Sequence, residues 1–236
     1  MDKFNAIEKA NRVVRIRDCI LLQGRSEQLI HPYGLDDLGP FDALVTDPPY
    51  GIDAAKMTMG SGRLKEFEKK ALWDSERVDI THFLKRAPQI VIWGGNYYTD
   101  MLPFTNDWLV WDKANTGTSF SEVELAWTNL GCNARIFRHH WGTLDGKKQH
   151  ITQKPQRVME WCLSRLPKTP KRVLDPFMGS GTTGVACAHF GIEFVGIELG
   201  DFNFEMACER IKAEYQRGDL FRDTQMDLFA QGVNDD

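Results

Sequence analysis

The stretch RVLDPFMGSGTTGVACAHFGIEFVGIEL, residues 172–199, decides the fold. Its first residues, RVLD, and its last residues, EFVGIEL, are rich in aliphatic side chains and predict two buried strands. A helix is expected between them, from about Thr182 to Phe190. A strand, a helix and a second strand in this order form a βαβ unit, which indicates a parallel sheet.

The turn before this helix is rich in glycine. Residues 179–184 read GSGTTG, a literal G-x-G-x-x-G. Gly179 and Gly181 remove side chains where a ligand must approach the backbone, and Glu198, at the end of the second strand, suits the two hydroxyls of a ribose. The pattern predicts a cofactor that contains adenosine, and a tight strand-to-helix turn without a ligand is the alternative. Gly184 is interpreted as a helix-packing residue.

Two features argue against a dinucleotide such as NAD. A dinucleotide-binding βαβ unit usually opens its domain, whereas this unit comes last in the chain. Asp175-Pro176 also places a carboxylate at the end of the first strand, where it would repel a pyrophosphate and attract a cation. An NAD-dependent oxidoreductase is therefore the weaker interpretation.

The rest of the chain also alternates strands with helices. Strands are expected at 19–23, 89–95, 107–113 and 122–128, and a further strand is expected to end at Asp47. ARIFRHHW (134–141) is expected to pair with 122–128 as a hairpin. Helices are expected at 26–30, 154–166 and 203–216. With 236 residues, the chain fits a single α/β domain over 1–236 with a doubly wound, mostly parallel sheet. A small insertion at about 113–150 and a flexible C-terminal tail at about 218–236 complete the expected organisation.

The composition predicts a cytoplasmic protein that contacts no membrane. No apolar run approaches the ~18 residues of a membrane span, and the charged N-terminus lacks a signal core. No C-x-x-C pair occurs and the number of cysteines is odd, so reduced thiols are expected and a zinc site is not. The five are Cys19, Cys132, Cys162, Cys187 and Cys208.

The net charge of -4 is unevenly distributed along the chain. Residues 200–236 contain nine acids and four bases, a net charge of -5, so the first 199 residues sum to +1. Residues 131–154 contain five bases and one acid, Asp145. A local excess of positive charge is typical of a nucleic-acid-binding face, and a solvated basic loop is the alternative.

A second motif, TDPPY, follows the apolar run ALVT. Asp47, at the carboxyl end of a strand, accepts hydrogen bonds, and Pro48 and Pro49 offer carbonyls without competing N–H donors. Tyr50 has a flat face for stacking on a base. If Asp47 and the Pro48 carbonyl hold both hydrogens of an exocyclic amino group, the lone pair of its nitrogen is exposed and can attack a methyl group on a sulfonium. A plain Pro-Pro turn is the alternative.

Together the motifs resemble the DNA amino-methyltransferases that use S-adenosylmethionine. In that family D-P-P-Y is the catalytic motif, and D-P-F-x-G-S-G-T-T with a downstream Glu is the cofactor site. HITQKP, residues 150–155, resembles the family's H-P-T-Q-K-P segment, with Ile151 in place of the usual proline. The motif order resembles the permuted β group. The resemblance covers about 24–216 and implies a Rossmann-like methyltransferase fold with permuted motif order.

The resemblance also implies roles for individual residues. The catalytic residues would be Asp47, Pro48, Pro49 and Tyr50. The residues that bind S-adenosylmethionine would be Asp175, Phe177, Gly179, Ser180, Gly181, Thr182, Glu198, Lys154 and Thr152. Asp175 would lie near the cationic methionyl end. Gly24-Arg25-Ser26 stands where the family often has a G-D-S-like segment, and because arginine replaces Asp there, no role is predicted for it.

The form of the catalytic motif indicates the target base. D-P-P-Y is usual in adenine-N6 enzymes of the family and S-P-P-Y is commoner in cytosine-N4 enzymes, so the resemblance favours a DNA (adenine-N6) methyltransferase, with cytosine-N4 as the alternative. Double-stranded DNA would be the partner, and the target base would be flipped out of the duplex. The insertion at about 113–150 would be the target-recognition region, and its shortness predicts a short recognition sequence or weak specificity. Residues expected to contact DNA phosphates are Arg135, Arg138, Lys147 and Lys148.

The C-terminal segment contains a further motif. Gln225-Met226-Asp227-Leu228-Phe229 resembles the Q-L-[SD]-L-F peptide by which bacterial DNA-processing proteins dock on the replicative sliding clamp. Leu228 and Phe229 would fill an apolar pocket while Gln225 makes polar contacts. A tail that folds back on the domain through Leu228 and Phe229 is the alternative. The cell would be a bacterium, with or without a phage, and the oligomeric state is left open.

Overall fold

The computed structural model describes residues 5–32, 36–52, 77–116, 121–140 and 153–231, with side chains as far as Gly218. The elements in this part of the chain are α1 (Ala6–Lys9), β1 (Arg12–Ile16), β2 (Cys19–Gln23), α2 (Ser26–Leu29), β3 (Ala43–Thr46), η3 (Ile80–Phe83), β4 (Gln89–Trp93), η4 (Gly95–Tyr97), β5 (Trp108–Asp112), β6 (Val123–Thr128), β7 (Arg135–Arg138), α4 (Gln156–Ser164), β8 (Arg172–Asp175), α5 (Thr182–Phe190), β9 (Glu193–Glu198) and α6 (Asp201–Gln231). Among these residues, no helix is both long and apolar enough to cross a membrane.

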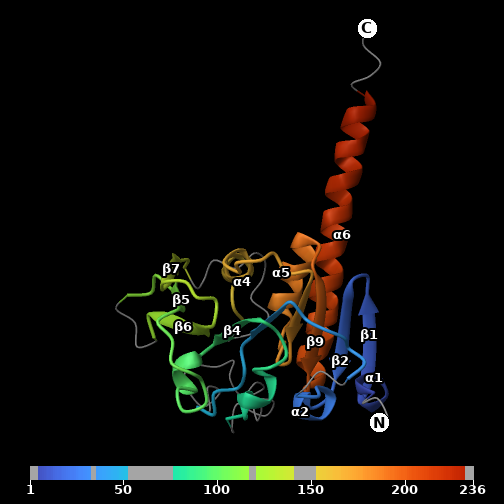
Figure 1. The fold of residues 1–236 in the computed structure, drawn as a ribbon. Coiled ribbons are helices and arrows are strands. Elements are labelled where there is room, and N and C mark those ends of the chain that lie inside the picture. The colour runs from blue at the N-terminus through green and yellow to red at the C-terminus, as the bar shows by residue number, and fades with distance from the viewer. Residues whose placement is uncertain (1–4, 33–35, 53–76, 117–120, 141–152, 232–236) are drawn as a thin grey trace, which may run out of the picture.

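The described strands form one sheet in the order β1-β2-β9-β8-β3-β4-β6-β5-β7 (Figure 1). β2, β9, β8, β3 and β4 run parallel to one another, whereas β1 and β6 run antiparallel to their neighbours. The predicted α/β class and mostly parallel sheet are therefore confirmed. The βαβ unit β8-α5-β9 lies in the middle of the sheet, and α5 has the predicted bounds.

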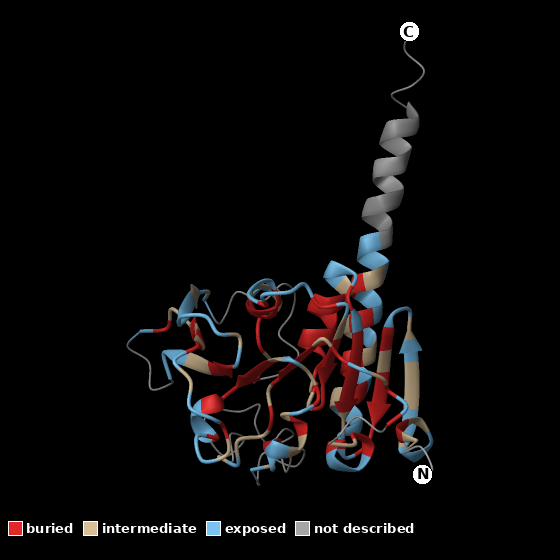
Figure 2. Cartoon of the chain, viewed as in Figure 1, coloured by how far each residue is buried: buried red, intermediate tan, exposed pale blue. Residues whose placement is uncertain are grey.

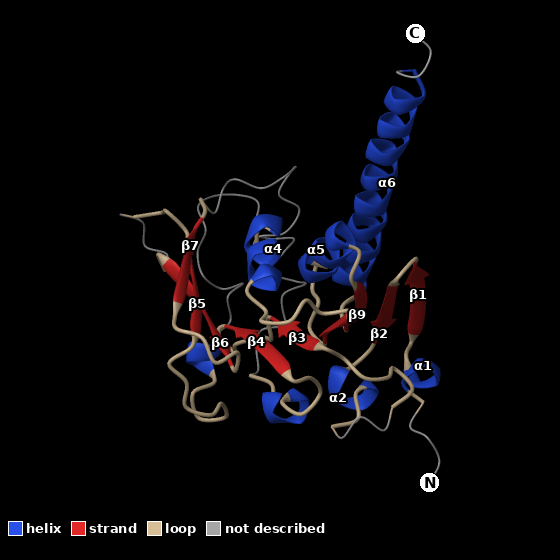
Figure 3. Ribbon diagram, turned by 45° about the horizontal axis from the view of Figure 1, so that its top comes forward, coloured by secondary structure: helices blue, strands red, loops and turns tan. Residues whose placement is uncertain are grey.

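Each central strand sends alternate side chains to the two faces of the sheet, as the pleat requires. Val45 and Val173 pack on the face covered by α4, α5 and α6, and Leu44 and Leu174 pack on the face covered by α2 and η3. Figure 3 shows the three longer helices together on one side of the strands. The buried residues coloured in Figure 2 accordingly form a core on each face, as in a doubly wound sheet.

The predicted hairpin between 122–128 and ARIFRHHW is wrong. β7 pairs with β5, in parallel, from Leu109↔Arg135 to Asp112↔Arg138. The reason is that both edges of β6 are already occupied, one by β4 and the other by β5. The free edge of β5 is therefore the place where another strand can add.

Two further differences concern the ends of the chain. β1 was not predicted, since RVVRI alternates only weakly, and it adds antiparallel to β2 at the edge of the sheet. The helix predicted to end at Gln216 continues to Gln231. A single glycine, Gly218, costs a helix only about 1 kcal/mol, and the segment contains no proline. The region expected to be a flexible tail thus has helical backbone as far as Gln231.

The contact between α5 and α6 gives a prediction for Gly184. A Cβ atom added at Gly184 would lie 2.5 Å from Ile211 Cδ1 and 2.7 Å from Phe194 Cε1, as expected of a glycine that permits close packing. We expect Gly184→Val to destabilise the fold by about 1–3 kcal/mol through overpacking, measured as the free energy of unfolding in urea. Gly218→Ala is the control, since open space surrounds that position. A Gly184→Val protein as stable as wild type would contradict this packing.

Candidate active site

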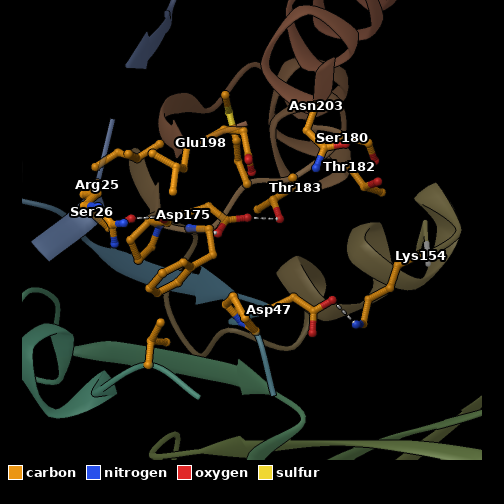
Figure 4. A pocket seen from close by; sticks show the side chains of 18 of the residues that line it. Arg25, Ser26, Asp47, Lys154, Asp175, Ser180, Thr182, Thr183, Glu198 and Asn203 are labelled. Atoms are coloured by element: carbon orange, nitrogen blue, oxygen red, sulfur yellow. Dashed lines mark hydrogen bonds and ion pairs between the residues drawn. The ribbon is translucent and has the colours of Figure 1, made fainter. Parts of the chain in front are cut away.

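The carboxyl ends of the central strands meet at one edge of the sheet and line a cavity of about 500 Å³. Asp175 ends β8, Glu198 ends β9 and Asp47 directly follows β3 (Figure 4). Because neighbouring parallel strands end at the same edge, two motifs far apart in sequence reach the same cavity. The other lining residues that the sequence singled out are Pro49, Lys154, Phe177, Gly179, Ser180 and Thr182.

Asp175 is the buried centre of this edge, with only 2% of its surface exposed. Its Oδ1 accepts hydrogen bonds from Thr46 Oγ1 at 2.7 Å and from the Phe177 amide at 3.1 Å, and its Oδ2 accepts one from Thr183 Oγ1 at 2.7 Å. Burial raises the pKa of Asp175 to about 6 although these three hydrogen bonds oppose the shift. The carboxylate therefore both fixes the turn after β8 and presents negative charge to the cavity.

The glycine loop has a backbone that only glycine adopts easily. Gly179 and Gly181 have φ angles of 51° and 78°, in the left-handed region. A Cβ atom on Gly181 would lie 2.8 Å from Ala207 Cβ, whereas nothing lies within 4 Å of the corresponding point at Gly179. Gly181 thus lets α5 pack on α6, and Gly179 leaves the floor of the cavity open at the N-terminus of α5.

Arg210 on α6 holds the same loop from behind. Its Nη1 donates to the Ser180 carbonyl at 2.5 Å, to Ser180 Oγ at 2.9 Å and to Thr182 Oγ1 at 3.1 Å. Burial lowers the pKa of Arg210 to about 10. No sequence motif indicated this residue, because its role depends on α6 packing against the loop.

Glu198 faces the cavity from the end of β9. Its Oε1 accepts a hydrogen bond from the Gly200 amide at 2.7 Å. Burial raises the pKa of Glu198 to about 7, and the charge of Asp175 contributes in the same direction. A buried carboxylate with a raised pKa is stabilised by hydrogen-bond donors or cations that enter the cavity. The hydroxyls of a ribose and a cationic group are ligands of this kind.

Asp47 lies between a cation and a phenol. Lys154 Nζ pairs with Asp47 Oδ2, and the Tyr50 hydroxyl donates to Asp47 Oδ1. Burial alone would lower the pKa of Lys154, but the charges of Asp47 and Glu124 outweigh it and raise that pKa. The pKa of Tyr50 lies well above its ordinary value because of burial and the charge of Asp47. Asp47 is therefore held as a hydrogen-bond acceptor at the rim of the cavity.

The ring of Tyr50 is fixed by what packs against it. It stacks on Tyr97 with ring centroids 4.7 Å apart and an interplanar angle of 18°. A Cβ atom on Gly94 would lie 2.0 Å from Tyr50 Cε1, so the residue that follows β4 must be glycine for the ring to fit. The Tyr98 hydroxyl donates to the Pro49 carbonyl, which orients the second proline of the motif. An aromatic wall thus stands beside Asp47.

The structure also adds residues that the sequence did not assign to the cavity. The segment Gly24-Arg25-Ser26, for which no role was predicted, lines it at the end of β2, and Ser26 Oγ donates to the Pro176 carbonyl. This segment reaches the cavity because β2 pairs with β9. Gln153, Met159 and Asn203 also line it. Gly24 and Ser26 match the family's G-D-S-like segment and could have indicated a lining role, but Arg25 in place of Asp argued against one.

Two of the residues expected to contact DNA are described. Arg135 and Arg138 lie on β7 at the edge of the sheet, both exposed, and Arg138 Nε lies 3.5 Å from Asp112 Oδ2. Lys147, Lys148 and Thr152 lie outside the described residues. Neither arginine lines the cavity.

Fold and site together define a class of protein: a doubly wound α/β domain in which a glycine loop, the carboxylate that ends β9 and an Asp-Pro-Pro-Tyr segment meet at one cavity. A family model described as DNA methylase, covering N6 and N4 methyltransferases, matches residues 110–209. Over this matched stretch the chain is similar to DNA amino-methyltransferases.

Two curated relatives match over short stretches at higher identity. The type II methyltransferase M2.DpnII of Streptococcus pneumoniae is 39% identical over 66 residues, 28% of this chain and 25% of the relative. The type II methyltransferase M.HpaI of Haemophilus parainfluenzae is 37% identical over 83 residues, 35% of this chain and 26% of the relative. The chain thus aligns with about a quarter of the length of these relatives.

Solved structures share the fold over most of the chain. The M1.HpyAVI–SAM complex has a TM-score of 0.55 and 23% sequence identity, covering 81% of this chain and 98% of that chain. The PvuII DNA methyltransferase, described as cytosine-N4-specific, has a TM-score of 0.52 and 15% identity, covering 84% of this chain and 92% of that chain. The Rossmann-like methyltransferase fold expected from the sequence is confirmed.

Proposed function

We propose that this protein transfers a methyl group from S-adenosylmethionine to the N6 amino group of adenine in double-stranded DNA. The observation behind the proposal is that Asp47 of the D-P-P-Y motif and the cofactor-type carboxylates Asp175 and Glu198 line the same cavity. The match of residues 110–209 to the DNA methylase family model and the similarity to type II methyltransferases support methyl transfer to DNA. A fold shared with a complex described as containing SAM supports the cofactor.

The residues present fit S-adenosylmethionine. Glu198 suits the ribose hydroxyls, Gly179 leaves space beside the loop, and Asp175 and Asp47 offer negative charge to a sulfonium and an ammonium. Thr152, outside the described residues, and Lys154 stay proposed contacts at the methionyl end. When bound, this cofactor supplies a methyl group on a positively charged sulfur, which is an electrophile.

The chain's own residues prepare the nucleophile. Asp47 Oδ1 and the Pro48 carbonyl accept the two hydrogens of the flipped amino group, so that the nitrogen lone pair is released from the aromatic ring. The methyl group that the cofactor would supply would then bond to this nitrogen, and the electron pair of the broken carbon–sulfur bond would stay on sulfur. The methylated nitrogen would give up one proton, and Asp47, as an acceptor of its hydrogen bond, would take it. Tyr50, stacked on Tyr97, offers a face to the flipped base.

We propose that the strands β5, β6 and β7 contact the DNA. Trp93, the last residue of β4, pairs with Ala126, and Ala126 also pairs with Leu109. β5 therefore extends past the carboxyl end of β4 as far as Asp112. This extension lies at the same edge of the sheet as Asp47. Arg135 and Arg138 flank this extension on β7. The position supports the proposal that this region recognises the target and that both arginines contact phosphates.

Other parts of the proposal rest on the sequence. Adenine is favoured over cytosine by the D-P-P-Y form of the motif, and the fold is shared with a cytosine-N4 enzyme as well. The cytoplasm of a bacterial cell is the proposed location. Docking on a sliding clamp through Gln225–Phe229 stays a prediction, because the side chains of that segment lie outside the described residues.

The proposed reaction is tested by incubating the protein with labelled S-adenosylmethionine and unmethylated duplex DNA, followed by digestion to nucleosides. We expect the label in N6-methyl-2′-deoxyadenosine of the DNA digest, at a short or loosely defined site. Label in N4-methylcytosine would overturn the adenine assignment. Absence of label from DNA of varied sequence would contradict DNA methylation itself.

The role of Glu198 gives a pH-dependent prediction. Its carboxylate must be ionised to accept both ribose hydroxyls, and its pKa in the free protein is raised to about 7. Adenosine is the ligand for this test because it has no group that titrates near neutral pH. Its affinity should rise by up to about tenfold per pH unit below the pKa of Glu198 and level off above that pKa. Calorimetry at several pH values measures this.

Glu198→Gln is the control for this pH dependence. The glutamine has a similar shape and does not titrate, so the affinity of this variant should be lower than that of wild type at high pH and should not change with pH. A wild-type affinity that is independent of pH, or a variant that keeps the wild-type profile, would contradict the assignment of Glu198 to the ribose.

A further inference from the structure

Four charged side chains of alternating sign form a line that ends at the catalytic motif. Lys154 Nζ pairs with Asp47 Oδ2 and lies 3.0 Å from Glu124 Oε2, and Glu124 Oε1 lies 2.7 Å from Lys113 Nζ. Figure 4 shows the first of these contacts, with Lys154 reaching Asp47 from the segment before α4. Glu124 comes from β6 and Lys113 follows β5, so the line crosses from the cofactor cavity into the strands proposed to recognise DNA.

This line is shielded from solvent along most of its length. The side chains of Lys154, Lys113 and Glu124 are 7%, 16% and 27% exposed. Each lysine also lies over an indole ring, with Lys154 Nζ 5.3 Å from the centroid of Trp93 and Lys113 Nζ 5.4 Å from that of Trp111. Two tryptophans and two carboxylates therefore restrict where the two ammonium groups lie.

The two oxygens of Asp47 have different partners as a result. Oδ2 pairs with a buried, charged ammonium, and Oδ1 accepts from the neutral hydroxyl of Tyr50. Both contacts involve the Asp47 carboxylate, but only the ammonium carries an opposite charge that attracts it. An incoming N–H group therefore displaces the neutral hydroxyl more easily than the ammonium. Oδ1 is therefore the oxygen that turns towards a target amino group.

We propose that Glu124 is a positioning residue for methyl transfer, which holds Lys154 against Asp47 Oδ2 so that Oδ1 is directed at the amino group of the target base. This inference rests on the proposed function. It assigns a role to a residue outside the D-P-P-Y, glycine-loop and HITQKP segments. Glu124 acts through Lys154 and does not touch the reacting atoms itself.

The charges along the line agree with this role. Burial would raise the pKa of Glu124, but the charges of Lys154 and Lys113 outweigh it and hold the pKa below its usual value. Asp47, Lys154, Glu124 and Lys113 therefore sum to zero when all are ionised. The neighbouring Tyr50 and the Cys162 thiol on α4 both have raised pKa values, chiefly through burial, and stay uncharged, and Tyr98 donates its hydroxyl to Pro49.

Removal of the Glu124 charge would change Asp47 in two ways. Lys154 would lose one of the two carboxylates that fix it, so the orientation of Asp47 would become less defined. The line would also gain a net positive charge, which stabilises the anionic form of Asp47 and makes it a weaker proton acceptor. Both effects slow the step in which the amino group is methylated and deprotonated.

The test compares Glu124→Gln with Glu122→Gln, which removes the same charge from an exposed position two residues away. Methyl transfer is measured in a single turnover with saturating S-adenosylmethionine and DNA, across a range of pH. We expect Glu124→Gln to lower the rate by about tenfold to a hundredfold, as misplacement of a reacting group by about 1 Å does. We also expect the acidic limb of its pH profile to move to lower pH. Glu122→Gln should match wild type in both respects.

Two further variants separate positioning from folding. Glu124→Asp keeps the charge on a shorter side chain and should recover part of the rate. If Glu124→Gln does not fold, Lys113→Gln leaves Glu124 paired with Lys154 and should show a smaller loss of rate at unchanged affinity for S-adenosylmethionine. Calorimetric binding of the cofactor to each variant confirms that the cavity is intact.

The outcomes distinguish this inference from the proposed function. A wild-type protein that methylates DNA, together with a Glu124→Gln variant of equal rate and pH profile, would overturn only the role of Glu124. Equal losses in Glu124→Gln and Glu122→Gln would overturn it as well. A wild-type protein that transfers no methyl group to DNA would contradict the proposed function, and the inference with it.

Discussion

The hydrogen bond from Thr46 Oγ1 to Asp175 Oδ1, 2.7 Å long and buried, is the contact on which the rest of the site depends. It joins the ends of β3 and β8, which pair in parallel at the centre of the sheet. Residues 129 apart in the sequence are thereby locked together at one edge. Asp47 follows directly on one side of this contact, and the glycine loop follows on the other. The D-P-P-Y motif and the glycine loop meet because their strands are neighbours, whatever their order in the chain.

The cavity at this edge gathers more negative charge than a buried site normally tolerates. Asp47, Asp175 and Glu198 all line it, and burial raises the pKa of the last two to about 6 and about 7. Desolvated carboxylates of this kind are stabilised by cations and by hydrogen-bond donors. A cofactor that carries a sulfonium, an ammonium and two ribose hydroxyls supplies both. The same electrostatics disfavour a pyrophosphate, which is the physical reason to separate this glycine loop from that of a dinucleotide enzyme.

Local patterns predicted the parts of the structure that depend on local physics. The bounds of α5, the strands β2 and β9 and the carboxylates at strand ends follow from hydrophobic periodicity and from the turn residues after β8. The pairing of β7 with β5 did not, because it depends on which strand edges remain free once the sheet has assembled. Arg210 and Ser26 were missed for a similar reason, since each reaches the cavity through the packing of another element.

Glu124 shows most clearly where the sequence is insufficient. In the alternating run EVELAWT, an acid between apolar residues is expected to point outward into solvent. In the folded chain the neighbouring strand and the segment before α4 bring Lys113 and Lys154 to it, and the outward position becomes part of an ionic line. No pattern within one strand contains this information. The charge of Glu124 can be read from the sequence, but its ion-pair partners depend on the tertiary fold.

The measurement that most directly tests this account pairs cofactor binding with methyl transfer in Asp47→Ala. Asp175 and Glu198 remain in this variant, and Lys154 keeps Glu124 as a partner. The account predicts that the variant binds S-adenosylmethionine with nearly wild-type affinity in a calorimeter and transfers no methyl group to DNA in a single turnover. Two results would contradict a cavity in which Asp47 performs the chemistry and the ends of β8 and β9 hold the cofactor. One is methyl transfer at the wild-type rate, and the other is a variant that loses both cofactor binding and methyl transfer.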